Sequence, residues 1–535
     1  MYTFSDYLKK YEEFGIVEEV RHPVVKVMGL PSVKPGEVVV FESNHLGQVL
    51  HMDEVVVEVL VFAKEPIPPK VQVARTGKSL SMLASDRLLG KVVNPLGSTF
   101  YRIKQSEVGT RKSGKDGHKK SDEQFFQEVG EERVLDIRPL SIVKRLQISE
   151  PLVTGVGLVD LLLPLGKGQR ELVVGDRKTG KTSFLLTAMK SQIQQGSKVI
   201  YAAIGKQLLE IDLVKQWLEK ENLIERVVMV ASTAHDSQSL VYLTPFTAMT
   251  LAEYFRDLGE NVLVILDDLS THAKFYREIS LLAGRFPGRD SYPGDIFYTH
   301  ARLLERAGNF VHPKQVSVSI SCLPVAETTE NDLSDYIISN LIGITDGHLL
   351  FDSREFIKGR RPAINALASV TRVGRQTQLL LHQNISQQLL TFLSDYQRSQ
   401  RYSHFGAEST DKMKEELKKG NLLFDFFNQD VELVLPLDIQ LLFVGMIWLQ
   451  LIGPEFTEKR KENEQVTPES QSQDARDSIK SQMIMAEYRL KLLDTYNRDQ
   501  EFRKWVSEVV QLADLYEMME KLNANRAKLL DIIKS

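Results

Sequence analysis

The chain has 535 residues, 42% of them hydrophobic and 26% charged, which is the profile of an ordinary soluble globular protein. Such a length exceeds one hydrophobic core and predicts roughly two to four domains. The net charge of -4 argues against bulk attraction to nucleic acid. The single cysteine, Cys322, excludes an internal disulfide and fits a reducing compartment.

The N-terminal part of the chain, residues 1–97, predicts an antiparallel β-barrel domain. Short β-branched runs such as VVVF, VVVEVLVF and KVQVAR alternate there with turn sequences that contain Gly and Pro. The barrel strands lack the clustered aromatic residues on which nucleic acid bases stack. The first residues, MYTFSDYLKKYEEFG, have no apolar core, so we do not expect a secretory signal.

A polar stretch, Lys104 to Arg133, follows the predicted barrel and contains the basic cluster RKSGKDGHKK. A basic cluster without interleaved aromatic residues is typical of a solvated loop. We therefore interpret residues 104–133 as an expanded polar loop and expect no nucleic acid partner.

The central part of the chain, residues 98–380, predicts an α/β domain of the RecA-like type. Apolar runs such as LVVG, VIYAAIG, VVMVAS and VLVILDD are separated by longer amphipathic segments. That alternation is typical of a parallel sheet covered by helices on both faces.

Helical periodicity dominates the rest of the chain, and we expect a C-terminal helical bundle at residues 381–456. Residues 457–535 are expected to form a polar linker, TEKRKENEQVTPESQSQDARDS, and a helical tail. The most apolar run, Ile439 to Gly453, is shorter than the roughly 20 residues of a membrane span. We expect a buried helix there, and membrane association only through partners.

The segment Gly175 to Thr182, GDRKTGKT, matches the phosphate-binding pattern G-x-x-x-x-G-K-[ST] at every position. An apolar run enters this phosphate loop and an amphipathic helix leaves it, as such a loop requires. Lys181 is expected on the β- and γ-phosphates, and the Thr182 hydroxyl on Mg²⁺. The expected nucleotide-binding residues of the loop are Gly175, Asp176, Arg177, Lys178, Thr179, Gly180, Lys181, Thr182 and Ser183.

A second strand, VLVILDD, ends in Asp267 and supplies the carboxylate that serves Mg²⁺ in such sites. Hydrolysis also needs a base that orients the attacking water, which in hexameric RecA-like ATPases is a glutamate at the end of the strand after the phosphate-loop helix, here VIYAAIG. Here Lys206 and Gln207 follow that strand, and Glu210 comes only inside the next predicted helix. Lys206 and Gln207 are expected to contact nucleotide without acting as a base. The sequence therefore predicts binding of ATP or ADP without hydrolysis by this chain alone.

Several long segments resemble the alpha subunit of F-type ATP synthase. They are GKGQRELVVGDRKTGKTS (Gly166 to Ser183), EYFRD (Glu253 to Asp257), LDDLSTHAKFYREISLLAGRFPGRDSYPGDIFYTHARLLERAG (Leu266 to Gly308) and KGRRPAINALASVTRVG (Lys358 to Gly374). The resemblance covers roughly residues 20–455, in the family's order of barrel, nucleotide domain and helical domain.

The resemblance implies a non-catalytic alpha-type subunit that alternates with beta-type catalytic subunits in a hexameric ring around a gamma-type shaft. A delta-like or lineage-specific partner is expected at the ends of the ring, and the location would be cytoplasmic, at the inner face of the cell membrane. The family's S-x-S-R-V-G motif reads SVTRVG here and implies that Arg372 is an arginine finger for the neighbouring beta subunit. Phe356, Arg361 and Pro362 match residues beside the adenine, and Glu327 matches a carboxylate near the phosphates.

The sequence departs from the family at several positions. Lys178 replaces the usual Gln of the phosphate loop, and Lys419-Gly420-Asn421 corresponds to an adenine-contacting Q-G-Q, so Lys419 and Asn421 become the candidate contacts. The N-terminal helix is short relative to the family, and the tail beyond Glu455 has no counterpart.

Three functions stay open at this point. The chain could serve a proton-driven ATP synthase, or an ATPase of the same type coupled to another machine, such as a motility machine. An autonomous P-loop motor for secretion or nucleic acid translocation is a third reading, and the missing glutamate argues against it.

Overall fold

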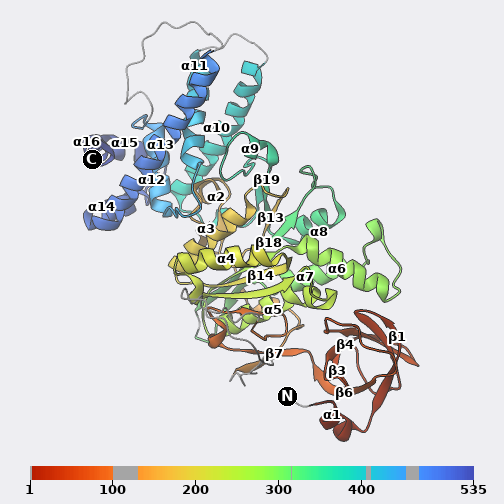
Figure 1. The fold of residues 1–535 in the computed structure, drawn as a ribbon. Helices are drawn as coiled ribbons and strands as arrows, with labels where there is room; N and C mark the ends of the chain where they lie inside the picture. The colour runs from red at the N-terminus through yellow and green to blue at the C-terminus, as the bar shows by residue number, and fades with distance from the viewer. Residues whose placement is uncertain (1–2, 100–129, 315, 405–410, 453–468, 535) are drawn as a thin grey trace, which may run out of the picture. The chain divides into compact units, whose positions relative to one another are not determined.

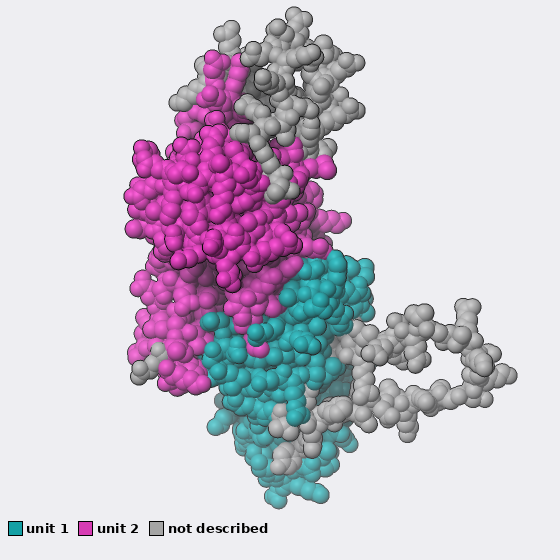
Figure 2. All heavy atoms as spheres, turned by 90° about the vertical axis from the view of Figure 1, so that its left-hand side faces the viewer, with its two compact units in different colours: residues 1–139, 199–306 teal, residues 140–198, 307–535 magenta. Residues whose placement is uncertain are grey.

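The computed structural model describes residues 3–99, 130–314, 316–404, 411–452 and 469–534. It falls into two compact units, coloured separately in Figure 2. Unit 1 comprises Met1–Pro139 and Val199–Arg306, and unit 2 comprises Leu140–Lys198 and Ala307–Ser535. Most of the predicted polar loop, residues 104–133, lies outside the described residues.

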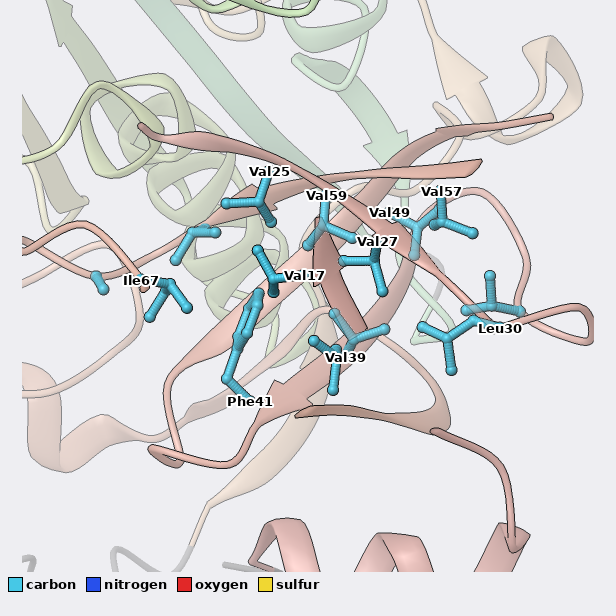
Figure 3. Close-up of a cluster of buried hydrophobic side chains, with 14 residues drawn as sticks. Val17, Val25, Val27, Leu30, Val39, Phe41, Val49, Val57, Val59 and Ile67 are labelled. Atoms are coloured by element: carbon cyan, nitrogen blue, oxygen red, sulfur yellow. The ribbon is translucent and has the colours of Figure 1, made fainter. Parts of the chain in front are cut away.

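Unit 1 begins with helix α1 (Phe4–Tyr11) and a closed six-stranded antiparallel barrel with the strand order β1-β2-β5-β4-β3-β6 (Figure 1). The strands are β1 (Phe14–Arg21), β2 (Val24–Met28), β3 (Glu37–Phe41), β4 (Leu46–Met52), β5 (Val56–Val61) and β6 (Gln72–Ser79). Alternate β-branched residues point inward, and Val17, Val27, Val39, Val59 and Phe41 fill the interior (Figure 3). Closure leaves no unpaired strand edge in the barrel.

The remainder of unit 1 is an α/β region in which apolar strands alternate with helices. Strands β16-β14-β15-β8 lie side by side in this order, and β15 pairs in parallel with both β14 and β8. Strands β7 and β9 form a separate antiparallel pair. The elements are β7 (Ser81–Ala84), η1 (Asp86–Leu88), β8 (Val92–Val93), β9 (Glu131–Val134), β14 (Lys198–Lys206), α4 (Leu208–Lys220), η3 (Ile224–Arg226), β15 (Val227–Thr233), α5 (Gln238–Asp257), β16 (Val262–Asp267), α6 (Leu269–Leu282), η4 (Arg289–Ser291) and α7 (Ile296–Leu304).

Unit 2 contains the strands β20-β19-β13-β18, side by side in that order. Strand β13 pairs in parallel with β18 and with β19, and every residue of β13 is buried, as strands of a covered parallel sheet are. The elements are η2 (Ile142–Lys144), β10 (Arg145–Leu146), β11 (Pro151–Leu152), α2 (Gly157–Leu162), β12 (Leu165–Gly166), β13 (Glu171–Gly175), α3 (Lys181–Gln194), β17 (Gly308–Val311), β18 (Ser317–Glu327), α8 (Tyr336–Ile344), β19 (Gly347–Phe351), α9 (Ser353–Ile357), β20 (Val370–Thr371) and η5 (Gly374–Thr377).

Helices form the rest of unit 2. They are α10 (Leu380–His404), α11 (Asp411–Phe427), α12 (Leu437–Trp448), α13 (Glu469–Arg498), α14 (Gln500–Val509), α15 (Leu515–Ala524) and α16 (Arg526–Lys534). Helix α12 is buried from Ile439 to Ile447, which confirms the predicted buried helix. A Cβ atom at Gly445 would lie 2.7 Å from Leu522, so glycine permits the close packing of α12 on α15. Among the described residues, none of the helices combines the length and hydropathy that a membrane crossing needs.

The predicted fold class is confirmed: an N-terminal antiparallel barrel, an α/β nucleotide-binding region and C-terminal helices. The predicted interruption at Thr457 to Ser478 is too long, because α13 already begins at Glu469. The many charges of this segment hide its helical spacing, so the helix was predicted to start later in the chain than it does. The domain limits at 97, 380 and 456 stay predictions.

Candidate functional site

The phosphate loop of unit 2 connects the end of β13 to the start of α3 (Figure 1). Gly175, Lys178 and Gly180 have φ angles of 154°, 62° and 98°, a backbone conformation that glycine adopts most readily. A Cβ atom on Gly175 would lie 2.2 Å from the carbonyl oxygen of Phe351, so no other residue fits there. Around Gly180 a Cβ atom would meet nothing within 4 Å.

Side chains of the loop hold its backbone in place. Lys181 Nζ donates to the carbonyl oxygens of Gly175 and Asp176, at 2.7 Å each. The Thr179 hydroxyl also donates to the backbone carbonyl oxygen of Asp176, at 2.7 Å. The Asp176 carboxylate accepts hydrogen bonds from Thr328 Oγ1 (2.7 Å), from the Asn331 N–H (2.9 Å) and from Ser353 Oγ (3.2 Å). The loop is therefore tied to the segments that follow β18 and β19.

The start of α3 offers donors for an anion. Gly180 caps this helix without a side-chain hydrogen bond, and the Thr182 and Ser183 side chains in its first turn are exposed. Free N–H groups at a helix N-terminus, next to a glycine loop and a lysine, suit phosphate oxygens. Arg177 pairs with Glu327 at 2.7 Å, so the structure brings these two predicted residues together.

In unit 1, Asp267 ends β16 and Lys206 ends β14. Lys206 Nζ lies 2.8 Å from Asp267 Oδ1, and the Tyr201 hydroxyl donates to Asp267 Oδ2 at 2.8 Å. Burial opposes the charge on Lys206, but Asp267 and Asp268 outweigh it and raise the pKa of the ammonium group. Burial and the neighbouring Asp267 raise the pKa of Tyr201 well above its usual range, so its hydroxyl keeps its proton. The contact of Tyr201 with Asp267 was not predicted, because a tyrosine in an apolar strand looks in the sequence like any other core residue.

No carboxylate stands directly after β14. Gln207 is the N-cap of α4, and its backbone N–H donates to Glu210 Oε2 at 3.2 Å. Glu210 therefore serves as the return partner of a capping box. Asp268 is the N-cap of α6, and its carboxylate accepts hydrogen bonds from the Thr271 N–H (2.6 Å) and the Thr271 hydroxyl (3.1 Å).

Arg372 follows β20 in unit 2 with an exposed side chain. Its backbone N–H donates to the Asp346 carbonyl at 3.0 Å, and its Nη1 contacts the Thr345 carbonyl at 3.4 Å. Asp346 is itself held by Arg170, whose Nη2 lies 2.7 Å from Asp346 Oδ1. The backbone at Arg372 is thus fixed while the guanidinium remains accessible.

A buried polar network lies beside Arg372. Gln169 Nε2 donates to Glu171 Oε2 at 2.7 Å and to Thr371 Oγ1 at 3.2 Å. Burial raises the pKa of Glu171 well above its usual range, and Gln169 opposes that shift only in part. The burial of Glu171 was not predicted, because a glutamate at the start of a strand gives no sign in the sequence of what surrounds it.

The residues matched to the adenine side come from α9, from the segment that follows it and from α11, all in unit 2. The Arg361 guanidinium stacks 3.7 Å above the Phe356 ring, and the Arg361 N–H donates to Asn428 Oδ1 at 2.7 Å, just beyond α11. Pro362 follows directly. On α11, Lys419 Nζ lies 4.6 Å from the Trp448 ring centre, and Asn421 Oδ1 accepts from the Tyr396 hydroxyl at 2.7 Å.

The described residues fit nucleotide phosphates better than they fit a metal held by protein alone. Within the described parts of the chain, no cluster of three or more His, Cys, Asp or Glu residues could hold a metal ion. A Mg²⁺ site of the P-loop type takes most ligands from phosphates and water, and the exposed Thr182 hydroxyl suits it. Asp267 suits it less, because each of its two oxygens already has a donor.

Comparison with known proteins agrees with this geometry. Residues 155–371 match the pattern of the ATP synthase alpha/beta family, nucleotide-binding domain. The ATP synthase subunit alpha of Sulfurovum sp. (strain NBC37-1) is 35% identical over 433 residues, which is 81% of this chain and 82% of that protein. The chain therefore belongs to the family of ATP synthase alpha subunits.

Proposed function

We propose that this chain is the non-catalytic, ATP-binding alpha-type subunit of an F-type rotary ATPase. The observation that carries the proposal is a contrast within the α/β region. The phosphate loop matches its pattern at every position, whereas Lys206 ends β14 and Gln207 follows it, where a hydrolysing subunit needs a carboxylate. The chain would therefore retain nucleotide and leave hydrolysis to a neighbouring beta-type subunit.

ATP or ADP is the proposed ligand of the nucleotide-binding residues that the sequence predicts. The loop Gly175 to Ser183 would take the phosphates, with Lys181 on the β- and γ-phosphates and Lys206 and Gln207 near the terminal one. Phe356, Arg361 and Pro362, with Lys419 and Asn421 from α11, would contact the base. The Arg361 stack on Phe356 supports this, because it presents a flat cationic surface beside an aromatic ring.

Mg²⁺ is proposed as a cofactor, and Thr182 and Asp267 remain the residues predicted to serve it. When bound, it would neutralise charge on the β- and γ-phosphate oxygens. The chain's own residues orient this end of the nucleotide through the first turn of α3 and through Lys181.

Arg372 is proposed as an arginine finger for the neighbouring beta subunit. Its side chain is exposed while its backbone is hydrogen-bonded to Asp346, so the guanidinium could leave its 3.4 Å contact with the Thr345 carbonyl and reach another subunit from a fixed base. A guanidinium placed on a γ-phosphate spreads the charge of the transition state, an effect of about 10³–10⁵ in rate.

The proposed partners are a beta-type catalytic subunit, a gamma-type shaft and a delta-like or lineage-specific subunit at the ends of the ring. Membrane attachment, at the cytoplasmic face, would come through these partners. The complex would couple ATP synthesis or hydrolysis to proton transport, or to another machine in place of the proton channel.

The test measures the rate of ATP turnover and the amount of bound nucleotide, for the purified chain alone and for its complex with the beta-type partner. We expect retained nucleotide with negligible turnover for the chain alone, and strong turnover for the complex. Robust turnover by the isolated chain would contradict the proposal and favour an autonomous P-loop motor.

A further inference from the structure

Helix α13 of the C-terminal tail contacts the part of unit 2 that carries the proposed base contacts. We propose that Arg489 of α13 is a positioning residue for base recognition: it fixes the end of α11 and, through that end, the backbone of Arg361. This inference rests on the proposed function as a nucleotide-binding subunit. It goes beyond that function because it gives the C-terminal tail a role in the affinity for the base.

Arg489 is bonded to the C-terminal end of α11. Its side chain is buried, and its Nη1 donates to the carbonyl oxygens of Phe426, at 2.8 Å, and Asn428, at 2.5 Å. Carbonyl oxygens at the end of a helix have no partner within that helix, and a cationic donor placed there stabilises the helix end. Arg489 is therefore a cap for α11 that another helix supplies.

The Arg489 guanidinium keeps its positive charge in this buried position. Burial lowers its pKa to about 10, and Asp430 and Asp425 oppose that shift. The group is therefore protonated at neutral pH, and its bonds to the two carbonyl oxygens are charge-assisted. Loss of such a donor costs more than loss of an exposed one, because a carbonyl oxygen shielded from water loses a partner.

The segment that Arg489 fixes is bonded to Arg361 at both of its backbone groups. The Arg361 N–H donates to Asn428 Oδ1 at 2.7 Å, and the Gln429 N–H donates to the Arg361 carbonyl oxygen at 2.8 Å. The Arg361 guanidinium lies 3.7 Å from the centre of the Phe356 ring. A shift at the end of α11 would therefore move Arg361 and the cation–π pair that is proposed to contact the base.

Helix α11 itself carries two more of the proposed base contacts, Lys419 and Asn421. Helix α13 holds α11 at a second place, where Ser481 Oγ donates to Asp425 Oδ2 at 2.6 Å. The phosphate loop is held by its own contacts and by the segments that follow β18 and β19. Loss of Arg489 should therefore weaken the binding of the base and leave the binding of the phosphates in place.

The experiment compares ATP with inorganic tripolyphosphate, which offers phosphates without a base. Both affinities are measured by calorimetry on the purified full chain in the same MgCl₂ buffer. We expect the wild type to bind ATP at least about tenfold more tightly than tripolyphosphate. Arg489→Met removes the donor and its charge, so it should weaken ATP binding by about tenfold and change the affinity for tripolyphosphate by less than about twofold.

Two variants separate the bonds of Arg489 from a general effect of substitution in α13. Arg489→Lys should stay within about threefold of the wild type for ATP, because one nitrogen, Nη1, makes both bonds and an ammonium group can replace it. Arg498→Met is the matched control, since Arg498 lies on the same helix, is 79% exposed and pairs with Asp494. It should leave both affinities unchanged.

A further variant tests the path from Arg489 to Arg361. Asn428→Ala removes the acceptor of the Arg361 N–H and should reproduce the effect of Arg489→Met on the two ligands. The double variant should bind ATP no more weakly than the weaker single variant, because both substitutions act on one contact. Additive losses would contradict this path and overturn the inference.

The outcomes separate this inference from the proposed function. Equal losses for ATP and tripolyphosphate in Arg489→Met, no loss for either, or a wild type that binds both ligands equally well would overturn the inference alone. A wild-type chain that binds neither ligand would overturn the proposed function itself. Should Arg489→Met fail to fold, Arg489→Gln, which is milder because an amide keeps a neutral donor, decides by the same comparison of the two ligands.

Discussion

The phosphate loop of unit 2 and the Asp267 strand end of unit 1 are built in different ways. The loop consists mainly of backbone: glycine angles, N–H groups at the start of α3, and carbonyls tied to Lys181. The strand end consists of side chains, in which Lys206 and Tyr201 surround one carboxylate. The chemistry of the second region therefore depends on the identity of a few side chains, whereas the first depends on a chain path that needs glycine at Gly175.

This difference is consistent with the proposed function, in which the subunit binds nucleotide and leaves turnover to a partner. Binding uses the backbone cradle, which is complete here. Hydrolysis would need a carboxylate at the end of β14, and Lys206 stands there instead. Four predictions sharpen this comparison, from the largest expected effect to the smallest.

Arg372→Ala should lower ATP turnover of the complex with the beta-type partner by about 10³-fold or more, because the finger acts only in the transition state. ATP binding by the chain alone should not change. The comparison variant is Arg375→Ala, another exposed arginine close in sequence. Normal turnover in Arg372→Ala would rule out the finger.

Gly175→Ala should destabilise the loop by roughly 3 kcal/mol or more, since the new Cβ would overlap the Phe351 carbonyl. Gly180→Ala should cost less, about 1–2 kcal/mol, because only the φ angle of 98° opposes it and the space is open. Thermal unfolding of both variants measures the difference. Equal losses of stability in the two variants would mean that the backbone angle, and not packing, determines the conformation of the loop.

Lys181→Ala should weaken ATP binding by at least about 30-fold, the loss of a charge-assisted hydrogen bond of roughly 2 kcal/mol. Calorimetry on the purified chain measures this affinity. Lys190→Ala is the control, because Lys190 of α3 donates to the Glu432 carbonyl and lies outside the loop. Unchanged affinity in Lys181→Ala would remove the phosphate-loop assignment.

Asn421→Ala should have the smallest effect, a loss of ATP affinity of about threefold, because one side chain beside the base is removed. Its bond with the Tyr396 hydroxyl is also lost, so the melting temperature is measured in parallel. Gln387→Ala on the exposed face of α10 is the control. An unchanged affinity would exclude Asn421 from the base side.

Much of the fold was predictable because its signals are local. Alternating β-branched residues predicted the barrel, since each strand presents one face to the interior. The apolar run at Ile439 predicted the buried α12, and glycines at fixed spacing predicted the phosphate loop. The start of α13 was misplaced, because a charged helix carries a weak apolar period.

The site was predictable only where residues act alone or within one motif. Sequence spacing showed that Lys206 follows a strand and that Asp267 ends another, but not that the two form an ion pair. Nor did it show that Glu171 is buried beside Thr371, or that Asp176 joins three segments of unit 2.

The sequence by itself determined which elements form and that a complete phosphate loop stands without a following carboxylate. Both depend on residues close together in the chain, where the spacing fixes the geometry. The tertiary structure decided which charges neutralise each other, because Lys206 and Asp267 are far apart in sequence and meet only when β14 and β16 become neighbours. Their contact follows from strand order, which the pattern of any single strand does not contain.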